Sequence, residues 1–329
     1  MYQPQTYVIA LSFMIVTMFC WGSWANTIKL CPGYRFQLFY WDYVWGLVLG
    51  SLVWGLTLGS MGVTGNSFFA DLAATNSRHL LMAIVGGITF NLANLLLVAA
   101  IDIAGLAVAF PIGIGLALVV GAVSSYLISP NGNPLFLFAG VILIVVAIVL
   151  DAGAYRLRER DRAAMSRRGV LLSLIAGLLM GAFYPFVSKA MSGEHAMGPY
   201  STAFIFSLGV LLCSVPVNYL FMRRPLDGGP PVSMHGYLRA PASWHIWGVL
   251  GGLIWCTGAV LNFVASRSQV VGPAVSYSIG QGATMISAAW GVFVWREFAS
   301  APAAAKRLIA FMFLFFLMGL TSVALAPLF

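Results

Sequence analysis

Long apolar runs, separated by short polar segments, follow one another along the whole chain. They are continuous, as in residues 135–150, and lack the two-residue alternation of a membrane-spanning β-barrel. About 20 apolar residues suffice for a helix to cross a bilayer, and a helix satisfies its own backbone hydrogen bonds there. The pattern predicts an all-α integral membrane protein with ten transmembrane helices. The expected spans are residues 7–28, 37–58, 80–102, 105–128, 134–152, 169–189, 200–221, 244–265, 272–295 and 307–326.

The composition supports this fold class. Of the 329 residues, 60% are hydrophobic and 8% are charged, whereas soluble domains have about 25% charged residues. The net charge of +8 does not indicate a nucleic-acid partner, because the basic residues flank the spans. The four cysteines lack metal-ligand spacing and are expected to be small buried side chains. Neither a metal nor another cofactor is expected.

Basic residues gather on one side of the predicted bundle. Lys and Arg concentrate in cytoplasmic loops, so the Arg-rich linker of residues 154–168 is placed in the cytoplasm. With ten spans, only Arg78, Lys189 and Arg267 of the 17 basic residues then fall outside. This asymmetry predicts a multi-pass protein of the cell (inner or plasma) membrane with both termini extracytoplasmic. The inverted orientation is the alternative.

The two halves of the chain resemble each other. The segment GLAVAFPIGIGLALVVGAV from Gly105 aligns with GPAVSYSIGQGATMISAAWGV from Gly272, so that Gly, Ala, Val, Ile, Gly and Gly coincide. We therefore predict a first five-helix repeat at 1–153 and a second at 169–329. An odd number of helices inverts the second repeat, a recurring plan of secondary transporters. The alternative is a chance match between Gly- and Ala-rich helices.

The segments CWGSWANTIKL, FYWDYVWG, FNLANLLLVAAIDIAGLAVAFPIGIGLALVVG and AVSYSIGQGATMISAAWGVFVWREF resemble the drug/metabolite transporter superfamily. Within it they are most similar to the ureide permease and glucose/rhamnose porter branches, over nearly the whole chain. The resemblance implies a substrate cavity between the halves and transport of a small polar metabolite. Plant ureide permeases are expected to carry a nucleotide-binding-like motif in a long central loop, whereas this chain has a short linker without G-x-x-x-x-G-K-[ST].

Polar and aromatic side chains within the spans are the candidate binding residues. Asn91 and Asn94 share a helix face, while Tyr277, Gln281 and Thr284 form a stripe at helical spacing. Such groups bind solutes or join helices by hydrogen bonds, and both interpretations stay open. Aromatic faces such as Trp21 and Trp24 suit sugar rings and planar heterocycles. The expected substrate-binding residues are Trp21, Trp24, Asn26, Asn91, Asn94, Tyr184, Trp255, Tyr277, Gln281 and Thr284.

Glycine and proline residues mark close packing or a hinge. Gly113, Gly115, Gly280 and Gly282 lie in the repeated segments, where they allow helices to approach or leave room for a ligand. Pro111 should kink the fourth helix.

Three acidic residues, Asp42, Asp102 and Asp151, lie within or at the end of spans. Asp42 and Asp102 are the candidates for carrying a coupled proton, and a uniporter is the alternative. For Asp42 the alternative is an interfacial ion pair with Lys29 or Arg35. We predict a secondary transporter that moves a small polar metabolite, first a sugar or polyol, by alternating access. The alternatives are a permease for ureides, nucleobases or amino-acid-like metabolites, or a drug exporter. No HExxH or GxSxG motif indicates an enzyme. The expected partners are the solute, the bilayer, protons as candidate coupling ions, and a second copy as a candidate homodimer.

Overall fold

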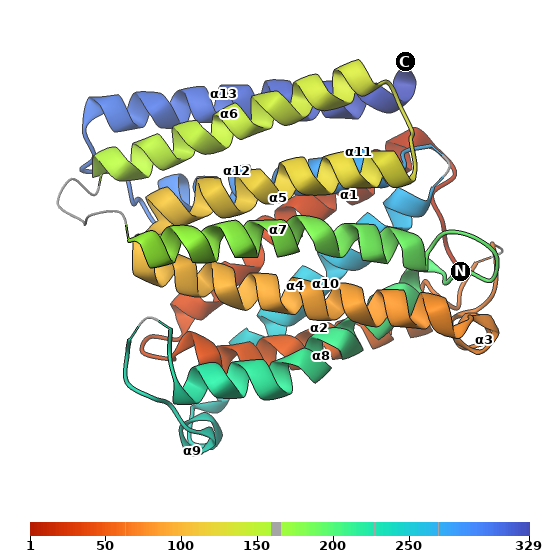
Figure 1. Ribbon diagram of the computed structural model, residues 1–329, viewed down its shortest axis with the longest axis horizontal. Coiled ribbons are helices and arrows are strands. Elements are labelled where there is room, and N and C mark those ends of the chain that lie inside the picture. Colours follow the sequence, from red (N-terminus) through yellow and green to blue (C-terminus); the bar gives the residue numbers. More distant parts are fainter. Residues whose placement is uncertain (63, 159–165, 227, 269) are drawn as a thin grey trace.

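The computed structural model describes residues 1–62, 64–158, 166–226, 228–268 and 270–329. Residues 159–165, the middle of the predicted basic linker, lie outside this part of the chain. Within the described residues the fold is all-helical, without a strand, and the long helices run side by side in one bundle (Figure 1). The helices are α1 Tyr7–Ser23, η1 Trp24–Leu30, α2 Phe36–Leu56, α3 Phe68–Ala74, α4 Ser77–Ala104, α5 Leu106–Ile128, α6 Pro134–Arg158, α7 Arg167–Ala190, α8 Pro199–Arg223, α9 Met234–Leu238, α10 Ala242–Arg267, α11 Pro273–Gly280, α12 Ala283–Ala289, η2 Trp290–Val294, α13 Ala303–Leu325 and η3 Ala326–Leu328.

Eight of the helices described here are long and apolar enough to cross a membrane. They are α1 with η1, α4, α5, α6, α7, α8, α10, and α13 with η3. The second predicted span corresponds to α2, which has 21 residues but is rich in Tyr and Trp and carries Asp42. The ninth corresponds to the successive short helices α11, α12 and η2.

The prediction of one continuous ninth helix is therefore wrong. Up to Gln281 the backbone amides bond four residues back, but Gly282, Thr284 and Met285 bond three residues back. Gly280 and Gly282 flank this break because each lies against the first span. A β-carbon on Gly280 would come within 2.7 Å of Trp21, and one on Gly282 within 2.5 Å of the Met18 sulfur.

The bundle has two ends that differ in charge. Both termini lie at one end, which we name the termini face, whereas α6 ends and α7 begins at the opposite end, the linker face (Figure 1). The ends of the described helices place Arg78, Lys189 and Arg267 at the termini face and most other basic side chains at the linker face. Both ends of the chain thus share a face opposite the basic linker, as the sequence predicts.

Helix α2 crosses α10 without room for side chains. A β-carbon on Gly46 or Gly252 would come within 2.8 Å of the other glycine's Cα. The one on Gly46 would also meet the carbonyl oxygen of Val249, and the one on Gly252 that of Tyr43. Each glycine thus faces the carbonyl three residues before its partner.

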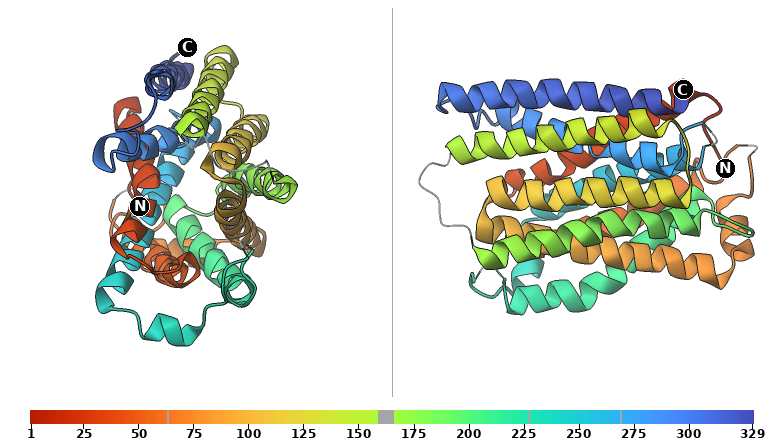
Figure 2. Two further views of the ribbon diagram at one scale, coloured as in Figure 1. Left: turned by 90° about the vertical axis from the view of Figure 1, so that its left-hand side faces the viewer. Right: turned by 45° about the horizontal axis from the view of Figure 1, so that its top comes forward.

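Helix α8 crosses α4 with the same geometry. A β-carbon on Gly209 would meet the carbonyl oxygen of Ile84, and one on Gly87 that of Phe206. Here too each glycine faces the carbonyl three residues before its partner. The pair α6 and α13 stands at one side of the bundle (Figure 2), where a β-carbon on Gly140 or Gly319 would meet the other glycine's own carbonyl oxygen.

The start of the aligned segments also has one conformation in both halves. Gly105 has φ 78° and ψ 160°, and Gly272 has φ 79° and ψ 164°. This region of backbone space is essentially restricted to glycine. Pro111, the expected kink, lies early in α5 near the linker face and not halfway along the helix.

Candidate transport site

An aromatic cluster fills the middle of the bundle around Trp255 of α10, which is 6% exposed. Its ring stacks on Trp21 of α1 at a centroid distance of 5.7 Å and on Phe206 of α8 at 6.1 Å. Phe90 of α4 lies 4.4 Å away and Tyr43 of α2 lies 6.4 Å away. Five helices from both halves of the chain therefore meet at this ring, which the sequence nominated.

Beside this cluster, the two predicted asparagines of α4 share one tyrosine. Tyr40 donates its hydroxyl hydrogen to Asn91 Oδ1 at 2.8 Å and accepts from Asn94 Nδ2 at 3.2 Å. Ser214 of α8 also donates to Asn91 Oδ1, at 3.0 Å. Tyr40 and Asn91 are completely buried. These hydrogen bonds join α2, α4 and α8. The polar face of α4 thus serves to hold helices together, which is one of the two interpretations of the sequence pattern.

A second buried network lies on the other side of the cluster. Tyr184 of α7 donates to Asn262 Oδ1 of α10, and Asn262 Nδ2 donates to the Ser276 carbonyl at 2.9 Å. Tyr277 packs 4.7 Å from Tyr184 and donates to the Ala117 carbonyl of α5 at 3.1 Å. Predicted residues Tyr184 and Tyr277 are thus close together, and their hydroxyls are already bonded within the protein.

Three polar atoms in the middle of the bundle have no partner among the described residues. They are Trp21 Nε1, the Tyr43 hydroxyl and Asn91 Nδ2. A buried polar group without a hydrogen bond costs about 1–3 kcal/mol, so each such group in a native fold calls for an explanation. Trp21 and Tyr43 both contact Trp255, and Asn91 reaches Tyr43 through the stacked ring of Tyr40. The unsatisfied atoms therefore belong to one contact chain of aromatic rings.

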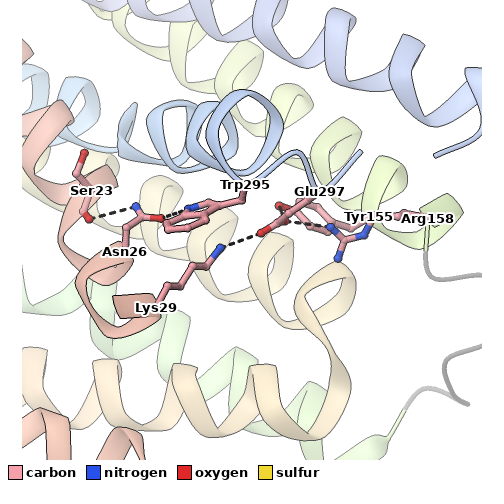
Figure 3. Close-up of polar contacts among 7 residues, drawn as sticks. All are labelled: Ser23, Asn26, Lys29, Tyr155, Arg158, Trp295 and Glu297. Carbon is pink, nitrogen blue, oxygen red and sulfur yellow. Dashed lines mark hydrogen bonds and ion pairs between the residues drawn. The ribbon is translucent and has the colours of Figure 1, made fainter. Parts of the chain in front are cut away.

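A hydrogen-bonded network closes the linker face beside α1 (Figure 3). Glu297, which precedes α13, binds Lys29 Nζ at 2.9 Å and Arg158 Nη1 of α6 at 3.0 Å. It also accepts from the Tyr155 hydroxyl at 3.2 Å. Burial alone would raise the pKa of Glu297, but the bonds and charges of Lys29 and Arg158 outweigh it and hold this pKa below the ordinary 4.5. The carboxylate is thus charged at neutral pH.

Predicted residue Asn26 belongs to this linker-face network. Its Oδ1 accepts from Trp295 Nε1 at 2.7 Å, and its Nδ2 donates to the Ser23 carbonyl at 3.1 Å (Figure 3). The structure therefore places Asn26 near the end of the bundle. Trp24, half-buried, packs 4.6 Å from Tyr43 and so reaches the edge of the aromatic cluster.

Asp42 forms a second polar cluster at the linker face. This carboxylate, 2% exposed, accepts from Tyr34 at 3.0 Å and from Tyr237 of α9 at 2.7 Å, and lies 2.9 Å from His245 Nδ1 of α10. Burial and the Asp42 charge raise the pKa values of Tyr34 and Tyr237, so both phenols keep the hydrogens that they donate. Lys29 and Arg35 were the candidate ion-pair partners of Asp42 from the sequence. In the structure His245 lies beside Asp42, and Lys29 pairs with Glu297.

The remaining predicted residues are more dispersed. Gln281 and Thr284 are buried on either side of the break between α11 and α12, and so do not form one helical stripe with Tyr277. Asp102 is exposed near the end of α4. Gly113 packs against Leu97 and lies under Gly177 of α7, whereas a β-carbon on Gly115 would meet only Ile148, at 4.0 Å.

A polar hollow of about 240 Å³ opens at the termini face, where α5, α7 and α10 end and α11 begins. Its lining residues are Ser129, Asn131, Ser188, Met191, Ser192, Ser266, Arg267, Ser268, Gly272 and Pro273. Ser266, one turn beyond Asn262 along α10, lines the hollow and donates to the Phe263 carbonyl at 2.9 Å. The aromatic cluster itself is filled by its own side chains, not open as the predicted cavity would be.

Sequence reasoning missed Asn262, Tyr40 and Tyr43. Asn262 stands within the apolar run of α10, and an intramembrane amide is a sufficient signal for a candidate site. Tyr40 and Tyr43 follow the polar start of α2 and resemble the aromatic residues of a membrane interface. Their burial depends on the close crossing of α2 and α10, which no local pattern reveals.

The fold and the buried polar core define a multi-pass membrane transport protein. A family model described as sugar transport protein matches residues 13–326, and the chain belongs to this family. It is 21% identical to Ureide permease 1 of Arabidopsis thaliana, with 97% of each chain covered, and 23% identical to Ureide permease 2 of that plant, with 88% and 89% covered. It is 23% identical to the glucose uptake protein GlcU of Bacillus subtilis (strain 168), over 67% of this chain and 70% of the relative.

A solved crystal structure shares the fold, with a TM-score of 0.66 at 15% sequence identity, covering 95% of this chain and 98% of that one. The relatives are permeases and an uptake protein, so this protein is a transporter of small metabolites and not an enzyme. The resemblance to the ureide permease and glucose porter branches is confirmed.

Proposed function

We propose that the protein is a secondary transporter that moves a small polar metabolite, first a sugar or related polyol, across the cell membrane by alternating access. The observation that carries this proposal is the aromatic cluster around Trp255, in which three buried polar atoms have no partner within the part of the chain that the structure describes. Two of them, Trp21 Nε1 and Asn91 Nδ2, are donors, and the Tyr43 hydroxyl can donate or accept. Hydroxyl or carbonyl oxygens of a bound solute would satisfy them.

We also propose ten spans arranged as two inverted five-helix repeats, 1–153 and 169–329. The paired glycine crossings support it, since α2 meets α10 as α8 meets α4, with the same spacing of glycine and carbonyl. The matching dihedrals of Gly105 and Gly272 support it further. Two similar halves can exchange conformations, which gives two states of similar energy that open to opposite sides.

The arrangement of contacts fits a state closed at the linker face. Glu297 with Lys29 and Asp42 with His245 tie separate helices together there, while the serine-lined hollow opens at the termini face. In the proposed orientation the linker face is cytoplasmic, so the hollow receives solute from outside.

The proposed alternative cargo is a ureide, a nucleobase, an amino-acid-like metabolite or an exported drug. Similarity to ureide permeases and to a glucose uptake protein supports both classes of cargo. Aromatic faces stack equally well on sugar rings and on flat heterocycles. Asp42 and Asp102 were the candidate carriers of a coupled proton, and Asp42 accepts hydrogen bonds from Tyr34 and Tyr237 in this structure. A homodimer stays a prediction of the sequence.

Counterflow into proteoliposomes tests this proposal. Vesicles loaded with unlabelled glucose, rhamnose, allantoin or uracil are diluted into the same labelled solute, and transient accumulation marks a cargo. We expect exchange of a sugar. Exchange of allantoin or uracil without any sugar would replace the first choice by the alternative. A panel without any exchange, in protein shown to be folded, would contradict the carrier for both classes of solute.

A further inference from the structure

A buried carboxyl near the linker-face end of α6 has no role in the site described above. Asp151 is 4% exposed, and its Oδ1 has no hydrogen-bond partner among the described residues. Removing an isolated carboxylate from water is unfavourable by several kcal/mol unless charges or donors compensate. The surroundings of Asp151 therefore suit a neutral carboxyl, with its proton in place.

The Glu297 carboxylate approaches α6 one helical turn beyond Asp151. Tyr155, at that turn of α6, donates its hydroxyl hydrogen to Glu297 at 3.2 Å. Among the elements packed against α6, α5 carries no charged residue, and α13 has Lys306 and Arg307 in its first turns. Lys306 donates to the Ala299 carbonyl. The Glu297 carboxylate, with its partner Arg158, thus lies at the same end of α6 as Asp151.

The segment that holds Glu297 has a strained backbone. Residues Trp290–Val294 form a π-helix, and the Trp295 amide donates to the Trp290 carbonyl at 2.9 Å. Arg296 has φ 52°, a left-handed conformation that is unfavourable for a residue with a β-carbon. π-Helical turns and such residues are frequent at functional sites, where surrounding contacts maintain them. Here the contacts of Glu297 with Lys29 and Arg158 supply that restraint.

We propose that Asp151 is a proton-binding site whose charge decides whether Glu297 holds Lys29 across the linker face. The proposal rests on the proposed transport function and extends it to the coupling ion. When the Asp151 carboxyl is protonated, Glu297 keeps Lys29 and Arg158, as in this structure. When the proton passes to water at the linker face, the new carboxylate repels Glu297 and competes for Arg158. The Lys29 contact then weakens, and the strained segment is free to relax.

Proton binding is measured without any solute. Infrared difference spectra of the full chain in phosphatidylcholine–phosphatidylglycerol vesicles are recorded across pH steps, and a protonated carboxyl band is expected to disappear as pH rises. Asp151→Asn should lack that band, while Asp42→Asn and the exposed control Glu194→Gln should retain it. Asp151→Leu is a second variant, because an unpartnered carboxyl is replaceable by an apolar side chain. A band that persists in both Asp151 variants, or no such band in the wild type, overturns the proposal.

The state of the gate is read from a single cysteine. In a chain whose four native cysteines are replaced by alanine, Asn26→Cys is labelled in nanodiscs with a maleimide reagent. We expect labelling to accelerate about fivefold as the carboxyl band disappears, a change that corresponds to ~1 kcal/mol. With Asp151→Asn labelling should stay slow at every pH, and with Glu297→Gln it should stay fast. Unchanged pH dependence in Asp151→Asn would refute the coupling to Glu297, whereas absent counterflow alone would refute only the transport function.

Discussion

Gly46 of α2 and Gly252 of α10 lie so close that a β-carbon on either would come within 2.8 Å of the other's Cα. Overpacking a tight contact typically costs about 1–3 kcal/mol, and here both neighbours are backbone and cannot rotate away. We expect Gly252→Ala to lower the thermal unfolding temperature of the purified protein clearly. Gly236→Ala is the matched control, because a β-carbon there would meet only Leu38, at 3.7 Å. Equal melting of the two variants would contradict the crossing.

Tyr43→Phe should separate binding from stability. The Tyr43 hydroxyl is buried with no partner in residues 1–62, 64–158, 166–226, 228–268 and 270–329, so its removal should leave the unfolding free energy unchanged or raise it by about 1 kcal/mol. The solute would lose one hydrogen bond, and its half-saturation concentration in counterflow should rise several-fold. Tyr40→Phe is the comparison, because that hydroxyl makes two bonds and its loss should destabilise the fold. A Tyr43→Phe carrier with unaltered half-saturation would show that this hydroxyl does not touch the solute.

Glu297→Gln should destabilise the protein in a pH-dependent way. The folded-state pKa of Glu297 lies below 4.5, so its ionised form stabilises the fold above that pH, and the benefit disappears as pH falls through the lowered value. The difference in melting temperature between wild type and variant should therefore be largest at neutral pH and shrink in acid below pH 4.5. Glu194→Gln, exposed at the other face, should show no such difference. A constant difference across this range would argue against the ion pairs.

Gly105→Ala and Gly272→Ala should be destabilising to a similar extent. Both glycines have φ near +78° with an extended ψ, as their values of 78° and 79° show, and a residue with a β-carbon is strained there by about 1–3 kcal/mol. Chemical denaturation of each variant in detergent measures the loss. A large loss in one variant and none in the other would weaken the proposed equivalence of the two halves.

Sequence patterns predicted the helices well because spans are long and their ends are polar. Span 134–152 was expected to end at residue 152, yet α6 continues to Arg158 because its last turns carry Tyr155 and Arg158, which bind Glu297. The break at Gln281 was not visible from composition, since it follows from contacts of Gly280 and Gly282 with distant side chains.

The candidate site was only partly predictable. Hydrophilic side chains in apolar runs identified Asn91, Asn94, Tyr184 and Trp255, but not which of them already bond one another. Asn26 follows Trp21 and Trp24 closely in the sequence, but it lies in η1 and bonds Trp295 near the end of the bundle. Partners separated by 203 positions, such as Asp42 and His245, come together only through the tertiary fold.

The Lys29 side chain is 42% exposed, so its bond to Glu297 stands partly in water. Dissolved ions screen such a pair, with a Debye length of about 8 Å at physiological ionic strength. The Lys29–Glu297 pair is screened only by ions of the compartment that contacts the linker face. In the proposed alternating-access cycle, the ratio of inward-facing to outward-facing protein would therefore depend on ionic strength at the linker face and not at the termini face. This dependence would make the carrier asymmetric, whatever its cargo.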